Sequence, residues 1–233
     1  MMYTVITGMS KTYYDNMGKS MLESWLKFWP KSFELLIYSE DDLSFLNSLN
    51  IKYINLDSLG EPYIKFQKEK YKKLNSRMKT YAKKAFPIMK HLEANQGKLI
   101  WVDADVITSS YITIEWLESL LPKNFFSCHL GVLQNEYYSV ETGFFIINLE
   151  NKHKAEFLKR YKNIYYNKDF SNMKKPYDGD TFGRIITEMK QIIDFRYNDL
   201  SPELKERSPF DRVFRNKMTH FKSKKKKNNY SKN

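Results

Sequence analysis

Two aspartates that directly follow a short apolar run are the residues of this sequence best suited to chemistry. Asp103 and Asp105 come after residues 99–102, a run with the length and the side chains of a buried strand. Residues two apart point to the same side of an extended chain, so both carboxylates can enter one site. Such a pair repels unless a cation lies between its members, and a divalent cation with oxygen ligands can also hold a diphosphate. The pattern equally allows a polar loop in which one aspartate caps the next turn.

The elements ahead of these aspartates predict a parallel, Rossmann-like α/β sheet. Asp15 or Asn16 is expected to cap a helix that Pro30 ends, and the turn of residues 40–42 can cap a second, short helix. Gly8, after Thr7, lets the backbone approach a ligand at the end of the first strand. The expected strands are residues 3–7, 33–39 and 51–56.

The rest of the chain predicts further helices and strands around the aspartates. A basic helical segment covers residues 63–94, with breaks near 75–76 and at Pro87. Residues 141–143 are expected to form a polar turn that leads into an apolar strand, and residues 196–216 to be irregular. The other expected elements are helices at 112–121, 151–166 and 181–189, and strands at 125–130, 144–149 and 192–194.

Composition predicts one soluble globular domain. The chain has 233 residues, of which 42% are hydrophobic and 28% charged. We expect a domain over residues 1–222 and a flexible lysine-rich tail over 223–233, which has too few apolar groups to fold by itself. Cys128 is the only cysteine, which indicates a reducing compartment. With no signal peptide or membrane-spanning segment recognisable in the sequence, we expect a cytoplasmic protein.

The net charge of +12 is concentrated at the carboxyl end. Residues 217–233 contain seven lysines and no acid, so the body of the chain carries only +5. A general nucleic-acid-binding surface is therefore not required. The tail alone could make weak contact with an anionic membrane surface.

Three later segments supply further candidate groups. Asp178 and Asp180 flank a glycine ahead of a helical pattern, where carboxylates either cap the helix or take part in chemistry. Glu141 precedes an apolar strand and is either a turn carboxylate or a functional one. His220 lies near the end of the chain, just ahead of the lysines.

Together these motifs resemble the GT-A glycosyltransferases, most closely those of the glycogenin and lipopolysaccharide galactosyltransferase types. The similarity lies in WVDADV at 101–106, VETGFFIINL at 140–149, and the histidine before the lysines, and it spans Tyr3 to about Lys226. It implies an α/β GT-A fold, which is a Rossmann-like nucleotide-diphospho-sugar transferase fold with a mixed, mostly parallel sheet flanked by helices. It also implies transfer of a sugar from a nucleotide-diphosphate donor such as a UDP-sugar to a hydroxyl of a glycan or small glycoside. The implied enzyme type is a hexosyltransferase.

The resemblance also assigns roles to residues. Asp103, Asp105 and His220 would hold Mn²⁺ or Mg²⁺ against the diphosphate. The catalytic carboxylate would be one of Asp178, Asp180 and Glu141, with retention or inversion left open. Substrate contacts are implied for Thr7, Gly8, Arg77, Lys83, Ala104, Thr142, Gly143 and Lys226. The chain departs from the family pattern at Gly179, where these enzymes carry a glutamine, and at Ser223, where they carry a glycine.

Other classes of protein remain open at this point. An apolar strand followed by DxDV also begins the haloacid-dehalogenase-type phosphatases, but here it lies behind a β-α-β-α-β segment. Their late G-D-x-x-x-D partner is also missing, because Arg184 stands in the place of the final aspartate. The remaining alternatives are an inactive nucleotide-sugar-binding protein and a basic protein that binds an anionic surface.

Overall fold

The computed structural model of the chain describes residues 2–48, 50–69, 76–94, 96–134, 137–170, 173, 177–201 and 209–221. Within these ranges, the side chains at 76, 77, 94, 133, 134 and 137 are not described.

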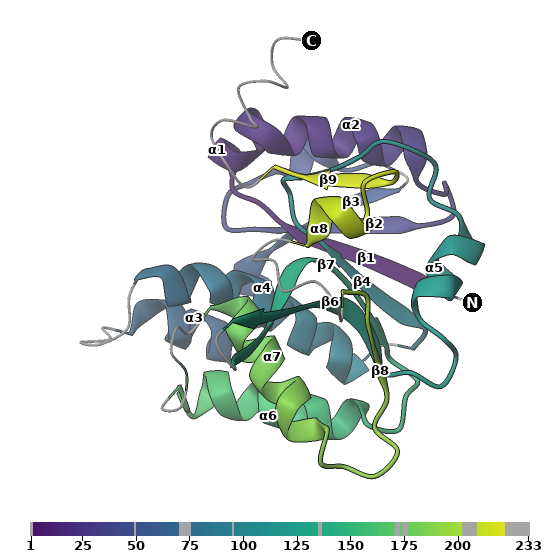
Figure 1. The fold of residues 1–233 in the computed structure, drawn as a ribbon. Coiled ribbons are helices and arrows are strands. Elements are labelled where there is room, and N and C mark those ends of the chain that lie inside the picture. Colours follow the sequence, from purple (N-terminus) through teal and green to yellow (C-terminus); the bar gives the residue numbers. More distant parts are fainter. Residues whose placement is uncertain are drawn as a thin grey trace.

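A seven-stranded sheet forms the centre of the molecule, with the strand order β3-β2-β1-β4-β7-β6-β8 (Figure 1). The first four strands in this order are parallel, β7 runs antiparallel to both β4 and β6, and β8 is parallel to β6. The mixed, mostly parallel sheet expected from the sequence is confirmed. The strands are β1 (Tyr3–Gly8), β2 (Glu34–Ser39), β3 (Ile51–Asn55), β4 (Lys98–Val102), β6 (Ser127–Gln134), β7 (Tyr137–Asn148) and β8 (Tyr197–Asp199).

Helices cover both faces of this sheet, which explains why the central strands read as continuous apolar runs. On β1, Val5 belongs to a core shared with α2, and the next residue, Ile6, to a core shared with α4, α6 and α7. In Figure 1, α2 lies on one side of the sheet and α3, α4, α6 and α7 on the other. The helices are α1 (Lys11–Tyr13), α2 (Lys19–Phe28), α3 (Glu61–Lys68), α4 (Ser76–Ala94), α5 (Ile114–Leu120), α6 (Lys154–Tyr166), α7 (Asp178–Met189) and α8 (Phe210–Val213).

A second, two-stranded sheet brings the end of the described chain to the aspartate motif. Strand β5 (Val106–Thr108) follows the aspartates and pairs antiparallel with β9 (Met218–His220). In this register Val106 lies opposite His220. The pairing fixes the late histidine beside Asp105, although 115 residues separate them in the sequence.

Several expected element boundaries are wrong, each for a local reason. Ser10, which accepts a hydrogen bond from the Tyr13 amide, caps the first helix in place of Asp15 or Asn16. Pro87 does not end its helix, because α4 continues through the buried Ile88. Residues 192–194 do not form a strand, since Asp194 has a φ of 65°, which turns the chain before β8.

The expected polar turn at residues 141–143 is also wrong. These residues lie inside β7, where Glu141 pairs with Leu130 of β6 and the Gly143 carbonyl accepts from the Asp103 amide. The proposed break near 75–76 cannot be placed, because residues 70–75 lie outside the described residues.

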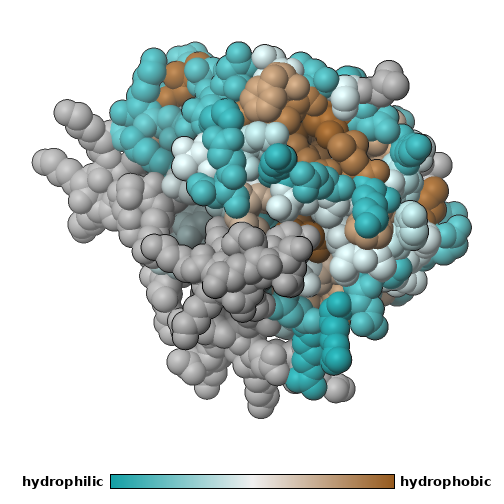
Figure 2. Space-filling model, turned by 90° about the horizontal axis from the view of Figure 1, so that it is seen from above, coloured by the Kyte–Doolittle hydropathy of each residue, from teal (hydrophilic) through white to brown (hydrophobic). Residues whose placement is uncertain are grey.

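The surface on the α2 side carries a hydrophobic patch among hydrophilic residues (Figure 2). Leu26 of α2 and Tyr111 are among the exposed large hydrophobic side chains, with 58% and 68% of their surfaces accessible. No helix in the described ranges is long and apolar enough to cross a lipid bilayer.

Candidate active site

A cleft of about 1130 Å³ opens at the carboxyl ends of β1, β2 and β4, where parallel sheets bind ligands. Most of the residues predicted from the sequence line it: Gly8, Lys83, Asp103, Ala104, Asp105, Glu141, Thr142, Asp178, Asp180 and His220. Two predicted residues lie behind its wall, because Thr7 is fully buried and Gly143 lies against the ring of His220. The side chain of Arg77 and the whole of Lys226 lie outside the described residues.

Asp103, Asp105 and His220 form a group able to hold a metal ion. One ligand atom from each lies within 4.8 Å of the others. His220 Nε2 is 2.9 Å from Asp105 Oδ1 and 3.6 Å from Asp103 Oδ2. Two carboxylate oxygens and one imidazole nitrogen suit Mn²⁺ or Mg²⁺ in both charge and donor type. The residues present therefore fit the expected cation.

Backbone contacts hold His220 in this position. The Phe221 amide donates to the Asp105 carbonyl at 2.9 Å, and the His220 amide donates to Asp211 Oδ1 at 3.0 Å. Burial alone would disfavour a charged ring. Close contacts with the carboxylates of Asp105 and Glu141, together with the charge of Asp103, outweigh burial and raise the pKa of His220 to about 9. At neutral pH the metal-free site therefore contains an imidazolium that offsets part of its negative charge.

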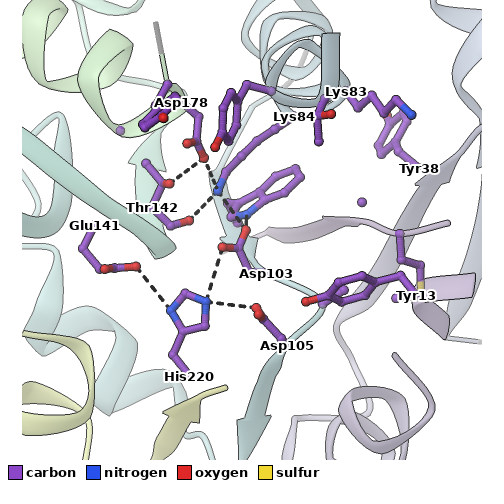
Figure 3. Close-up of a pocket in the computed structure, with 18 of the residues that line it drawn as sticks. Tyr13, Tyr38, Lys83, Lys84, Asp103, Asp105, Glu141, Thr142, Asp178 and His220 are labelled. Carbon is purple, nitrogen blue, oxygen red and sulfur yellow. Dashed lines mark hydrogen bonds and ion pairs between the residues drawn. The ribbon is translucent and has the colours of Figure 1, made fainter. Parts of the chain in front are cut away.

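Lys84 links the aspartate motif to the helix that carries Asp178. Its Nζ donates to Asp103 Oδ1 at 2.8 Å and to the Thr142 carbonyl at 2.6 Å, and it lies 3.0 Å from Asp178 Oδ2 (Figure 3). It also lies 4.6 Å above the ring of Trp101. Burial alone would lower the pKa of this lysine, but the two aspartates outweigh burial and raise it. Lys84 is a buried, charged bridge between two carboxylates.

The family resemblance implied a substrate contact for Lys83 and assigned no specific role to Lys84. Lys83 lines the cleft and forms an ion pair with Glu40, and its contact with a substrate stays a prediction. One signal was present in the sequence: Lys84 shares a helix face with Ile88, four residues further on, and a lysine on an apolar face needs a buried partner.

Asp178 and Asp180 both lie in the first turn of α7. Asp178 accepts from Thr142 Oγ1 at 2.6 Å, and Asp180 accepts from Ser139 Oγ at 2.7 Å. Burial alone would raise the pKa of Asp178, but Lys84 and the hydrogen bond from Thr142 outweigh it and lower the pKa. Tyr177, not an aspartate, is the residue at the N-cap. Both carboxylates thus lie in the wall of the cleft at a helix N-terminus, where negative charge is favoured.

Gly179, between the two aspartates, lies directly against the backbone of β7. A Cβ atom at this position would be 2.2 Å from the Val140 carbonyl oxygen, closer than any real contact. A glutamine therefore cannot replace the glycine without moving the helix. In this chain the carboxylates on either side are the polar groups that the turn presents to the cleft.

Tyr13, from α1, is a site residue that the sequence analysis did not find. Burial and a hydrogen bond to Asp105 raise the pKa of its hydroxyl, so the hydroxyl stays neutral and donates to the carboxylate. The chain contains 17 tyrosines, and no local pattern distinguishes Tyr13 from the others.

The cleft carries an excess of negative charge. Glu40 and Lys83 pair with each other at the rim. The other charged residues that line the described part of the cleft are five carboxylates and two cationic groups: Asp103, Asp105, Glu141, Asp178 and Asp180 against Lys84 and His220. A divalent cation would reduce this imbalance.

Comparisons with known proteins identify the fold. No model of a protein family and no curated protein sequence matches this chain. Among solved structures, it is similar to apo mouse xyloside xylosyltransferase 1, with 13% identity, a TM-score of 0.59, and 86% of this chain and 85% of that one covered. The chain has the GT-A fold. The GT-A fold expected from the sequence motifs is therefore confirmed.

Other GT-A structures match over still more of the chain. A glycosyltransferase involved in glycosylation of the major capsid of PBCV-1 is 13% identical, with a TM-score of 0.53 and complete coverage of both chains. The galactosyltransferase LgtC, in complex with donor and acceptor sugar analogues, is 13% identical, with a TM-score of 0.51 over 95% of this chain and 87% of LgtC. At this identity the likeness establishes the GT-A fold, and the roles of individual residues rest on the geometry above.

Proposed function

We propose that the protein is a metal-dependent glycosyltransferase that moves a sugar from a nucleotide-diphosphate donor to a hydroxyl acceptor. The sugar that we propose first is a hexose. The donor that we propose first is a UDP-sugar, and the acceptor a glycan or small glycoside. The observation that carries the proposal is the Asp103–Asp105–His220 group in the wall of a GT-A cleft. The single buried Cys128 supports work in a reducing compartment such as the cytoplasm.

The chemistry needs negative charge to be stabilised on the leaving diphosphate. A bound Mn²⁺ or Mg²⁺ would supply Lewis-acid stabilisation there, held by the two aspartates and His220. Lys84 adds a fixed positive charge beside Asp103 and keeps that carboxylate in place. We propose Arg77 and Lys226, whose side chains lie outside the described residues, as further phosphate contacts.

The carboxylates of α7 are proposed to face the sugar. A sugar that loses its leaving group develops positive charge at the anomeric carbon, and a nearby carboxylate stabilises that charge. Asp178 and Asp180 line the cleft and are held by Thr142 and Ser139, so their oxygens need little reorganisation. We assign them as the catalytic carboxylates.

A donor panel tests this function. The protein is incubated with different nucleotide sugars and Mn²⁺, and release of free nucleoside diphosphate is measured with and without small glycoside acceptors. At least one donor is expected to be turned over, and chelation of the metal is expected to stop the reaction. Release of inorganic phosphate from phosphate esters, lost in Asp103→Asn, would instead indicate a phosphatase. Donor binding without turnover would indicate an inactive sugar-nucleotide-binding protein.

The metal assignment is tested by Asp105→Ala. In the presence of Mn²⁺, this variant is expected to bind the donor no better than the chelated wild type does, because it lacks one of the three ligands. The matched control is Glu34→Ala, which removes a surface carboxylate at the opposite, amino end of β2. Metal-dependent donor binding that survives in Asp105→Ala would remove the metal site from the proposal.

A further inference from the structure

We propose that Glu141 is a positioning residue that fixes the ring of His220 for metal binding, and that it is not the general base. This inference rests on the proposed function, because it concerns the same metal site. It revises the role that the sequence motifs implied for Glu141. It makes the two residues a carboxylate–histidine pair behind the metal ligands.

The geometry places the two nitrogens of His220 in different surroundings. Nε2 faces the aspartate pair, 2.9 Å from Asp105 Oδ1. Nδ1 lies on the opposite side of the ring, 3.2 Å from Glu141 Oε1. Figure 3 shows the ring between Glu141 on one side and Asp103 and Asp105 on the other.

This division of the nitrogens matches what a metal ligand requires. An imidazole that binds a cation through Nε2 must carry its remaining proton on Nδ1. A carboxylate that accepts this proton in a hydrogen bond fixes the tautomer and makes the ligand nitrogen more basic. Glu141 is the carboxylate at that position, and only 3% of its side chain is exposed.

The walls around the ring leave it little freedom to turn away. A Cβ atom on Gly143 would be 2.5 Å from His220 Nδ1 and 2.6 Å from Cε1, so only glycine leaves room for the ring. The ring of Phe210 lies 5.0 Å away at an angle of 63°. Glu141 and Gly143 are two residues apart on β7 and therefore share the strand face on which the histidine lies.

The same burial argues against a role as general base. A base must reach the hydroxyl of an incoming acceptor, within about 3 Å. The side chain of Asp178 is 17% exposed, against 3% for Glu141, so α7 offers a more open carboxylate in the same cleft.

The closing experiment measures Mn²⁺ affinity by titration calorimetry in the full chain, without donor. Glu141→Met, which removes the acceptor of the Nδ1 proton, is expected to weaken Mn²⁺ binding about 10- to 100-fold. Glu141→Gln retains a side-chain oxygen that can accept a hydrogen bond from the Nδ1 proton. We therefore expect a smaller loss of Mn²⁺ affinity in this variant than in Glu141→Met. The matched control, Glu118→Gln, neutralises a carboxylate that pairs with Lys98 at the far end of β4 and should leave the affinity unchanged.

Histidine ¹⁵N shifts give a readout that does not depend on activity. In the Mg²⁺-loaded wild type, His220 should carry its proton on Nδ1, and in Glu141→Met the signals should shift towards a mixture of tautomers. Thermal unfolding in chelator checks the fold of each variant, and the near-isosteric Glu141→Gln keeps the test possible if Glu141→Met does not fold.

The outcomes separate this inference from the proposed function. Unchanged Mn²⁺ affinity and an unchanged tautomer in a folded Glu141 variant would overturn the positioning role and leave the metal site intact. If, in addition, that variant loses turnover, Glu141 acts in the chemical step. A wild-type chain that binds no Mn²⁺ would overturn the proposed metal site and this inference together.

Discussion

At the scale of single residues, Lys84 is the buried cation that joins two carboxylates of the cleft, Asp103 and Asp178. It is buried, and it lies within 3.0 Å of oxygens from three separate segments: Asp103, Thr142 and Asp178. An ion pair in such a place stabilises little by itself, because removing the charges from water costs nearly as much as their attraction returns. Loss of one partner is different, because it leaves a buried charge without compensation.

Lys84→Met tests this dependence. The substitution nearly keeps the length of the side chain and removes its charge, which leaves the buried Asp178 without its ion-pair partner and Asp103 with His220 as its remaining cationic neighbour. We expect the free energy of unfolding to fall by roughly 3 kcal/mol, the lower end of the range for a broken buried ion pair. Denaturant unfolding at neutral pH measures it.

Lys83→Met is the matched control on the same helix. Lys83 pairs with Glu40 at the surface, where a salt bridge contributes between about 0 and 1 kcal/mol. Equal decreases in the free energy of unfolding of the two variants would show that the buried ion pairs of Lys84 contribute no more to stability than a surface salt bridge.

At the scale of elements, the contact between α7 and β7 sets where the acidic turn lies. Gly179 and Gly183, one helical turn apart, both press on the β7 backbone. A Cβ atom on Gly183 would be 2.6 Å from the Tyr138 carbonyl oxygen and 2.8 Å from the Ser139 Cα. Backbone atoms cannot rotate away as a side chain can, so larger residues would force the helix off the sheet.

Gly183→Ala should therefore destabilise the protein, although alanine is the better helix former by about 1 kcal/mol. We expect a net loss of about 1–3 kcal/mol from overpacking, measured by thermal or denaturant unfolding. Turnover of a donor should fall as well, since α7 carries Asp178 and Asp180. The control is Thr187→Ala at an exposed position of the same helix. It loses the hydrogen bond from Thr187 Oγ1 to the Gly183 carbonyl, which the better helix propensity of alanine offsets, so we expect stability to change by less than about 0.5 kcal/mol. A stabilised Gly183→Ala protein would mean that helix propensity outweighs the contact.

At the scale of the whole molecule, the core on the α4, α6 and α7 side of the sheet encloses two histidines that burial keeps neutral. His91 of α4 contacts the Tyr38 hydroxyl at 2.9 Å, and burial, aided by Lys90, lowers its pKa to about 4. His129 of β6 contacts the Tyr138 hydroxyl at 2.9 Å and stacks on Tyr197. Burial lowers its pKa to about 4 as well, even though Asp199 opposes this shift.

Acid should therefore destabilise the fold before most carboxylates titrate. Unfolded histidine takes up a proton near pH 6.5, whereas these two do so only near pH 4, so the unfolded state binds more protons in between and stability falls as the pH falls. The loss from pH 6.5 to 5 is roughly 1.5 kcal/mol for each histidine. His220 does not mask it, because a raised pKa gives a contribution that is already nearly complete below pH 6.5.

Denaturant unfolding across this range, in chelator, measures the slope. The slope should be smaller in His129→Gln and in His91→Gln than in the wild type, whatever their absolute stabilities are. Slopes equal to that of the wild type would show that neither histidine is kept neutral in the fold.

The sequence by itself determined the features that depend on neighbouring residues. These features are short-range patterns, which the periodicity of side chains reveals. They are the apolar strand before Asp103, the alternation of strands and helices in the first half, and the two carboxylates around Gly179. The pairing of His220 with the aspartates was reached only through resemblance to a family, because no local pattern joins residues 115 positions apart.

Only the tertiary structure decided which charges meet. It chose Lys84 over its neighbour Lys83, because the packing of α4 on the sheet turns one lysine inward and the other to the rim. It placed residues 141–143 inside β7 rather than in a turn, because Glu141 pairs with β6 and the Asp103 amide, just beyond β4, donates to the Gly143 carbonyl. It brought Glu141 behind His220 for the same reason: contacts between distant segments depend on sheet order and register, which local sequence does not encode.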